Sequence, residues 1–278
     1  MKQAGLLQLA PIPSDSNGLF ALWRVLLQTS ATASIHNRAG TAFHQVNMLS
    51  VIIPVYNEES TVEEVIARVR ALPMDLEIIV VDDGSTDGTH DILSVQPDDG
   101  VVKVCTSQRN FGKGAAIRTG LDFVHGDIVI IQDADLELDP EEYPQLIGPI
   151  EAGRTRVVYG SRFREPTPGV SAKTRLANRM LSAWCNLLFG SRLTDVSTAY
   201  KVFRTEVVKG LGLTCVGFEF CAEVTAKLLR AGERIEEAPV GYHPRSSNAG
   251  KKLRYWRDGL KAAWWLLKLR FGRSTPVS

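Results

Sequence analysis

Three acidic residues at alternate positions follow an apolar run near the middle of the chain. Residues 128–131 are all apolar, and Asp133, Asp135 and Glu137 come directly after Gln132. In an extended segment alternate side chains point to the same side, so these three carboxylates could project from one strand end into one cleft. Hard oxygen ligands suit Mg²⁺ or Mn²⁺, which proteins bind through few carboxylates and share with substrate phosphates. The alternative is a solvated acidic turn after a buried strand.

Apolar and helical segments alternate around this acidic run. Strands are expected at residues 49–55, 77–81, 101–105, 128–132 and 157–159, with helices between them at about 62–69, 87–95 and 114–124. A capping box at residues 60–63 is expected to open the first helix, and Asp139 with Pro140 the helix after the acidic run. The alternation predicts a doubly wound, mostly parallel α/β sheet. Such sheets bind ligands beyond the carboxyl ends of their strands.

Polar side chains follow three strands of this predicted sheet. They are Tyr56-Asn57-Glu58, Asp82-Asp83 and Asp133-Ala134-Asp135, and their common sheet edge favours a functional site over ordinary surface. The turn Gly112-Lys113-Gly114 fits neither a P-loop nor a dinucleotide-binding motif. Its glycines would let the backbone approach a ligand, with Lys113 able to meet a phosphate; a plain helix-opening loop is the alternative.

Beyond residue 160 the regular alternation ends, and a basic tract closes the chain. Helices are expected at 173–189 and 218–229, and strands at 200–203 and 235–242. Residues 245–273 hold nine Lys or Arg against one acid, and their apolar residues fall at helical spacing, namely Trp256, Leu260, Ala263, Trp264, Leu267 and Phe271. Such a basic amphipathic helix can lie in a membrane interface, or it can pack its tryptophans on the domain. No nucleic-acid-binding motif accompanies it.

Composition sets few further limits on function. The net charge of +1 predicts no partner, and no apolar run approaches the roughly 18 residues needed to span a bilayer. Four scattered cysteines without zinc-binding spacing favour a reduced, cytosolic location. Residues 1–47 lack both periodicity and a signal-peptide pattern. We therefore expect a disordered N-terminal extension, with a targeting or interaction segment as the alternative.

Taken together, the strand-end loops resemble those of the family 2 glycosyltransferases. The matching segments are residues 50–59, 80–89 and 133–135, the last being an Asp-x-Asp metal motif. Within that family the chain looks most like the polyprenyl-phosphate branch, the dolichol-phosphate mannose and glucose synthases and their relatives. The segments that carry this closer likeness are 109–114, 133–140, 160–163, 195–204, 217–220, 242–245 and 250–252. Residues 246–249 depart from it, because an acidic residue is expected there. The resemblance covers about residues 48–270. It implies a nucleotide-sugar-binding (GT-A, Rossmann-like) domain at 48–245, and the basic, membrane-facing segment follows at 246–278.

The resemblance assigns site residues position by position. It implies that the nucleotide is held at Pro54, Tyr56, Glu58 and Asp83, and that a basic loop near the donor includes Arg245, Lys251 and Lys252. Asp133 would lie near the ribose and the metal, while Asp135 and Glu137 would bind the Mg²⁺ or Mn²⁺ that bridges the donor diphosphate. Arg162 and Arg175 match positions that hold the lipid phosphate. Mannose synthases usually have glutamine at position 137, so Glu137 favours a glucose- or hexosamine-type donor.

The expected reaction is inverting transfer of a hexose from a UDP- or GDP-linked sugar to dolichyl or undecaprenyl phosphate. A lipid monophosphate is largely a dianion at pH 7 and needs no strong base, so positioning and charge neutralisation by Asp135, Arg162 and Arg175 would supply most of the rate. One alternative is a family 2 transferase acting on a saccharide hydroxyl, with Asp195 as the candidate base. Another is a non-catalytic nucleotide-binding adaptor. We expect peripheral attachment at the cytoplasmic membrane face, or reliance on a separate membrane protein.

Overall fold

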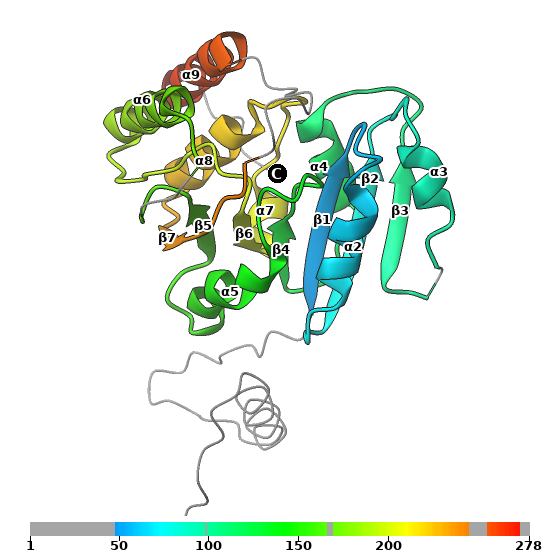
Figure 1. Cartoon of the computed structure of the whole chain (residues 1–278). Helices are drawn as coiled ribbons and strands as arrows, with labels where there is room; N and C mark the ends of the chain where they lie inside the picture. Colours follow the sequence, from blue (N-terminus) through cyan, green and yellow to red (C-terminus); the bar gives the residue numbers. More distant parts are fainter. Residues whose placement is uncertain (1–47, 98, 166–168, 245–254, 273–278) are drawn as a thin grey trace, which may run out of the picture. The chain divides into compact units, whose positions relative to one another are not determined.

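The computed structural model describes residues 48–97, 99–165, 169–244 and 255–272. All of them belong to one compact unit, Gln45–Ser278. Within it a seven-stranded sheet, in the order β3-β2-β1-β4-β6-β5-β7, carries helices on both faces (Figure 1). The extension expected at residues 1–47 lies outside the described residues, so its disorder stays a prediction.

The sheet is mixed but mostly parallel. Its strands are β1 (Leu49–Val55), β2 (Leu76–Asp82), β3 (Val102–Thr106), β4 (Ile128–Ile131), β5 (Val157–Ser161), β6 (Lys201–Arg204) and β7 (Ile235–Pro239). β1 to β4 run parallel, and β7 is parallel to β5. β6 runs antiparallel to both of its neighbours, β4 and β5. The predicted fold class is confirmed; the direction of β6 is not evident from sequence because a short apolar strand has the same pattern in either direction.

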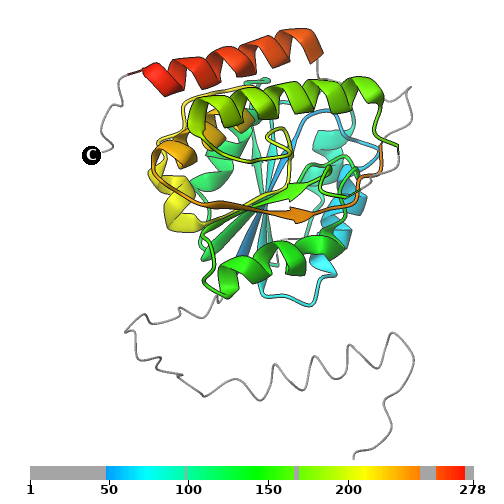
Figure 2. The same ribbon diagram turned by 90° about the vertical axis from the view of Figure 1, so that its left-hand side faces the viewer.

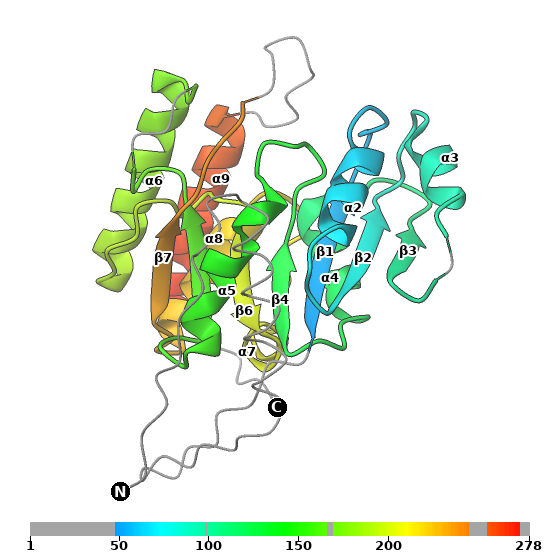
Figure 3. The same cartoon turned by 60° about the horizontal axis from the view of Figure 1, so that its bottom comes forward.

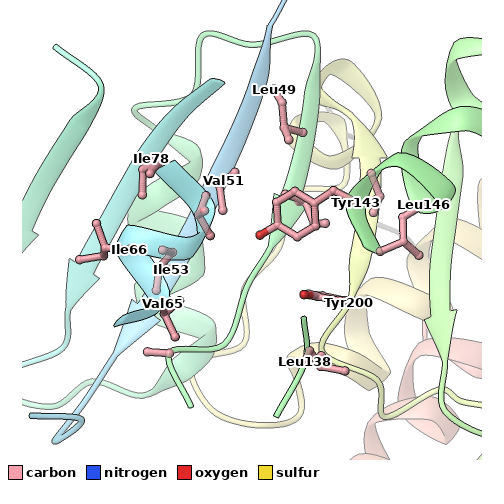
Figure 4. Packing of buried hydrophobic residues seen from close by; sticks show 14 of the residues in the cluster. Leu49, Val51, Ile53, Val65, Ile66, Ile78, Leu138, Tyr143, Leu146 and Tyr200 are labelled. Carbon is pink, nitrogen blue, oxygen red and sulfur yellow. The ribbon is translucent and has the colours of Figure 1, made fainter. Parts of the chain in front are cut away.

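The apolar run of β1 is buried on both sides because helices cover both faces of the sheet. Val51 and Ile53 pack in a cluster with α2 (Val62–Arg70), α3 (Thr89–Ser94) and α5 (Tyr143–Glu151), and Figure 4 shows the part of this cluster formed with α2 and α5. Ile52 packs on the opposite face with α4 (Lys113–Leu121), α7 (Thr205–Gly210) and α8 (Phe220–Arg230). Successive side chains of a strand alternate between faces, so a central strand covered on both sides requires an unbroken apolar run.

Two long helices lie outside the layer that contains α8. α6 (Ala172–Phe189) and α9 (Tyr255–Phe271) run side by side in Figures 2 and 3. They pack with α8 around Cys185, Ala262 and Leu266, and the Trp184 indole donates to the Ala263 carbonyl at 3.2 Å. The helix predicted in the C-terminal tract is therefore present. Of the helices in the described ranges, none combines the length and the apolar composition needed to cross a bilayer.

The first helix begins where it was expected, but the predicted capping box at residues 60–63 is wrong. α2 begins at Val62, and its N-cap residue Thr61 makes no side-chain capping hydrogen bond, because the Thr61 hydroxyl donates instead to the Ala134 carbonyl at 2.6 Å. The expected cap at Asp139 is confirmed. Its carboxylate accepts from Glu141 N at 3.1 Å and begins the 3₁₀ turn η1 (Pro140–Glu142) ahead of α5. Thr61 thus ties the start of α2 to the acidic loop rather than capping its own helix.

Candidate active site

Three polar loops meet at the carboxyl edge of the sheet, next to β1. This strand lies between β2 and β4, so the chain changes direction across the sheet here, which is where open α/β sheets bind ligands. Asn57 N donates to Ser85 Oγ and Glu58 N donates to Thr89 Oγ1, both at 2.9 Å. These bonds join the loop after β1 to the loop after β2 and to the start of α3, as Thr61 joins it to the loop after β4. Pro54 and Tyr56 are half-buried at the same edge.

Asp83 is buried and shapes the turn at residues 109–114. Its two carboxylate oxygens accept from Phe111 N at 2.9 Å and from Gly112 N at 2.6 Å. Gly112 has a φ of +106°, and a Cβ there would collide with the carbonyl oxygen of Val216, so only glycine fits this position. In the structure Asp83 therefore stabilises this turn. The contact of Asp83 with a nucleotide stays a prediction.

Lys113 forms an ion pair with Asp133 across the site. Lys113 Nζ lies 2.5 Å from Asp133 Oδ1, and the two side chains are 20% and 23% exposed. Burial, the largest single influence, would lower the pKa of Lys113, but its pKa is raised overall, mainly by the charge of Asp133 and the hydrogen bond to it. Lys113 is also the first residue of α4, where the helix dipole favours an anion rather than a cation. The turn therefore brings positive charge against the first residue of the acidic run.

The acidic run does not have the extended geometry predicted from its alternation. β4 ends at Ile131, and Leu136 has a left-handed φ of +58°, so the backbone turns. Asp135 Oδ1 accepts from Glu137 N at 3.2 Å, and Glu137 Oε2 accepts from the Tyr242 hydroxyl at 2.9 Å. In the part of the chain that the structure describes, no three His, Cys, Asp or Glu side chains form a metal-binding group. The three carboxylates therefore do not line up as an extended strand would place them.

Two of these carboxylates still fit a divalent cation. Mg²⁺ and similar ions are commonly held by one or two carboxylates and complete their shell with water and substrate phosphates, so a group of three is not required. Asp133 and Asp135 are both half-buried in the turn after β4 and supply hard oxygen donors. Glu137 is held by Tyr242. The donor set thus suits Mg²⁺ or Mn²⁺ through Asp133 and Asp135 more directly than through Glu137.

Arg162 and Asp195 form a buried, bidentate pair. Arg162 Nε and Nη2 donate to the two Asp195 carboxylate oxygens at 2.8 and 2.9 Å, and Asp195 is fully buried. Burial would lower the pKa of Arg162, but the Asp195 carboxylate raises it above its usual range. With both oxygens used in this way, the geometry makes Asp195 the residue that orients Arg162. A role as a general base would require it to release that pair.

Glu237 and Lys201 hold the loop that carries Asp195, and the sequence motifs did not single them out as site residues. Glu237 accepts from Thr194 N and Asp195 N at 2.9 and 3.0 Å. Lys201, fully buried in β6, donates to the carbonyls of Val196 and Thr198 at 3.1 and 2.6 Å, and burial lowers its pKa. The sequence signal for this role is that Lys201 stands inside an apolar strand, because a buried charge requires hydrogen-bond partners.

Arg175 and Arg162 both lie against the Phe163 ring, and their contact with a lipid phosphate stays a prediction. The guanidinium of Arg162 is 5.4 Å from the centre of the Phe163 ring, and that of Arg175 is 5.8 Å from it. Arg175 comes from the exposed side of α6. Arg162 is also 5.4 Å from the Tyr242 ring. The predicted donor-side residues Arg245 and Lys251, with Lys252, lie outside the described residues.

Comparison with known proteins identifies a family and several relatives. Residues 50–212 match the family described as Glycosyl transferase family 2. The chain is 32% identical over 177 residues to the undecaprenyl-phosphate 4-deoxy-4-formamido-L-arabinose transferase of Photorhabdus laumondii, covering 61% of this chain and 53% of that protein. It is 30% identical over 244 residues to the undecaprenyl-phosphate mannosyltransferase of Micrococcus luteus, covering 80% of this chain and 98% of that protein. The chain thus spans about half the length of the first relative and nearly all of the second.

Solved structures share the fold. Glucosyl-3-phosphoglycerate synthase from Mycobacterium tuberculosis superposes with a TM-score of 0.63 at 24% identity, covering 87% of this chain and 90% of that one. A complex of the same enzyme with Mn²⁺, uridine diphosphate and glucosyl-3-phosphoglycerate gives a TM-score of 0.63 at 22% identity, covering 87% and 88%. At this level of identity the likeness establishes the fold alone.

Proposed function

The chain belongs to glycosyl transferase family 2, and on that premise we propose that it moves a hexose from a UDP- or GDP-linked sugar to a polyprenyl phosphate, with inversion at the sugar. The names of its relatives support such an acceptor. The observation that carries the proposal is that Tyr242 contacts both halves of the site. Its hydroxyl donates to Glu137 and its ring lies against Arg162. The acidic side suited to a metal-bound donor therefore adjoins the cationic side suited to a phosphate acceptor.

A phosphate acceptor fits the acceptor side better than a hydroxyl does. A lipid monophosphate is largely a dianion at pH 7, so it can attack without a base once it is aligned with the sugar. In this proposal Arg162 and Arg175 bind and orient the phosphate, and Asp195 fixes the plane of the Arg162 guanidinium. Asp195 is a poor base because both of its oxygens accept from Arg162. Its pairing weighs against a saccharide-hydroxyl acceptor.

On the donor side, Asp133 and Asp135 would hold Mg²⁺ or Mn²⁺, and the bound cation would offset the diphosphate charge that builds up as the sugar leaves. Lys113, at the N-terminus of α4, would meet the phosphates. The nucleotide would contact Pro54, Tyr56, Glu58 and Asp83, and Arg245 and Lys251 stay predicted donor contacts from the sequence. The carboxylate of Glu137, where mannose synthases usually have glutamine, favours a glucose- or hexosamine-type donor.

The outer sides of α6 and α9 suit the surface of the membrane that contains the acceptor. Exposed apolar side chains are Leu176, Met180 and Leu187 on α6 and Leu260, Trp264, Leu267 and Phe271 on α9. Exposed Lys268 accompanies them on α9 and would attract anionic headgroups, whereas the Lys261 ammonium is paired with Glu219 of the domain at 2.9 Å. A neighbouring face of α9, with Ala262 and Leu266, packs on the domain instead. We include peripheral attachment at the cytoplasmic face in the proposal, through the segment 246–278 and α6, with a separate membrane protein as a further partner.

Product analysis tests the function. The protein is incubated with radiolabelled UDP- and GDP-sugars, Mg²⁺ or Mn²⁺, and undecaprenyl or dolichyl phosphate. The expected result is label in the lipid phase that disappears with EDTA or with the Asp135→Ala variant, and a product whose NMR spectrum shows the inverted anomer. Arg162→Met should also lose the lipid-phase label. Its matched control is Arg154→Met, at an exposed arginine paired with Glu236, which should keep the label. Label found only in a water-soluble saccharide would replace this proposal by a saccharide-hydroxyl acceptor.

A further inference from the structure

The ion pair between Lys113 and Asp133 joins two residues whose backbones are both held in place. Asp133 follows Gln132, whose Nε2 donates to the Asp133 carbonyl at 3.0 Å. The Gln132 Oε1 atom in turn accepts from the hydroxyls of Tyr143 and Tyr200, both at 2.8 Å and both from fully buried side chains. A buried, satisfied network of this kind is rigid. The backbone of Asp133 is therefore held in place from behind.

The backbone of Lys113 is also held, so only its side chain has freedom. Gly112 N donates to Asp83, and Ala115 N donates to the Val216 carbonyl at 3.0 Å. These bonds fix the chain on both sides of Lys113. Its four-carbon stem carries a compact ammonium with rotatable donors, and it starts at the end of α4 that attracts anions. The ammonium can therefore leave Asp133 for a nearby phosphate without any movement of the loops.

A divalent cation would compete with this ammonium. Both are drawn to the same Asp133 carboxylate, and two positive ions on one carboxylate repel each other. A nucleoside diphosphate removes the conflict because its phosphates offer Lys113 other oxygens and offer the cation further ligands. Binding of the cation and of the diphosphate should then reinforce each other, and this coupling is reciprocal by thermodynamic necessity.

We infer that Lys113 and a divalent cation are alternative counter-ions of Asp133, and that a nucleoside diphosphate exchanges one for the other by drawing Lys113 onto its phosphates. The inference rests on the proposed function, in which Asp133 lies beside the metal. Lys113 then has two roles: it holds Asp133 ready for the cation, and it makes firm metal binding depend on the donor. Without the Lys113 charge, the affinity of the protein for the cation in the absence of nucleotide should rise on the order of tenfold over the wild type.

Titration of the full chain with Mn²⁺ alone, and with UDP or GDP present, tests the inference through free Mn²⁺ measured by electron paramagnetic resonance. Lys113→Met should tighten Mn²⁺ binding without nucleotide and shrink the gain that nucleotide brings. Lys113→Arg should keep the wild-type pattern because the charge is kept. Lys103→Met removes an exposed lysine that lies over the Phe123 ring, and it should change neither affinity. In an Asp133→Asn background, Lys113→Met should lose its effect.

The outcomes separate this inference from the proposed function. If the wild type binds Mn²⁺ with UDP or GDP, but Lys113→Met does not tighten binding of Mn²⁺ alone, the exchange is refuted and the function stands. If Lys113→Met has its effect equally in the Asp133→Asn background, the competition is not for Asp133 and the inference fails. If no Mn²⁺ binds with either nucleotide, both the inference and the metal-dependent function fail. Circular dichroism shows that each variant is folded.

Discussion

Replacing Asp195 with asparagine tests whether this carboxylate positions Arg162. Asp195 is fully buried and the Arg162 side chain is 13% exposed, with contacts of 2.8 and 2.9 Å between them. The backbone N–H of Arg162 also donates to Asp195, at 3.2 Å. Asparagine has nearly the same shape but no charge, so it would leave the guanidinium uncompensated inside the protein. Breaking a buried pair in this way costs about 3–5 kcal/mol of unfolding free energy.

The assay is denaturant and thermal unfolding of Asp195→Asn beside a control of the same chemistry. For a domain of this size, a loss of that order lowers the Tm by roughly 10 °C. Glu236→Gln breaks the pair with Arg154, whose partners are 26% and 59% exposed, and it should cost less than about 1 kcal/mol. The double variant Arg162→Met with Asp195→Asn should be less destabilised than the sum of the single variants, because the charges are removed together.

Two results would refute the reasoning. If Asp195→Asn is no less stable than Glu236→Gln, the pair does not hold Arg162 as the geometry indicates. If the variant keeps full stability but loses turnover, Asp195 acts on the substrate, and the role of general base replaces that of a positioning residue.

Three further changes address the donor turn, acid stability and the membrane surface. Gly112→Ala, at φ +106° and against the Val216 carbonyl, should cost about 1–3 kcal/mol in denaturant unfolding, whereas Gly148→Ala, in open space within α5, should be neutral or stabilising. Burial would raise the pKa of Glu223, but hydrogen bonds from Cys215, Lys227 and Thr214 lower it to about 2. Because this pKa is lower in the folded than in the unfolded protein, the ionised carboxylate stabilises the fold. That stabilisation is complete above about pH 4.5 and is lost as the pH falls toward 2. Glu223→Gln should therefore lose roughly 3 kcal/mol at pH 7 and show a flatter acid dependence in urea unfolding. Trp264→Glu should weaken sedimentation with anionic vesicles several-fold, whereas Val95→Glu, at a residue 78% exposed elsewhere, should bind vesicles as the wild type does.

The sequence by itself determined the main layers of the protein and the edge where its site lies. The run from Leu49 to Val55 is apolar throughout, and only a strand covered on both faces requires that pattern. The structure shows this strand inside the sheet, between β2 and β4, with the polar loops after β1, β2 and β4 bonded together. Periodicity and turn residues are local, so they can be read along the chain.

Only the tertiary structure decided which partner each polar side chain takes. The Thr61 hydroxyl could cap its own helix, but it donates instead to the carbonyl of Ala134, 73 residues away. Leu136 adopts a left-handed φ that turns the acidic run away from the extended form, and Glu137 pairs with Tyr242, 105 residues away. Lys113 with Asp133 and Glu237 with the Asp195 loop are likewise joined by the fold alone. A buried polar group must find a partner wherever the fold provides one, and local sequence does not record which of many distant groups that will be.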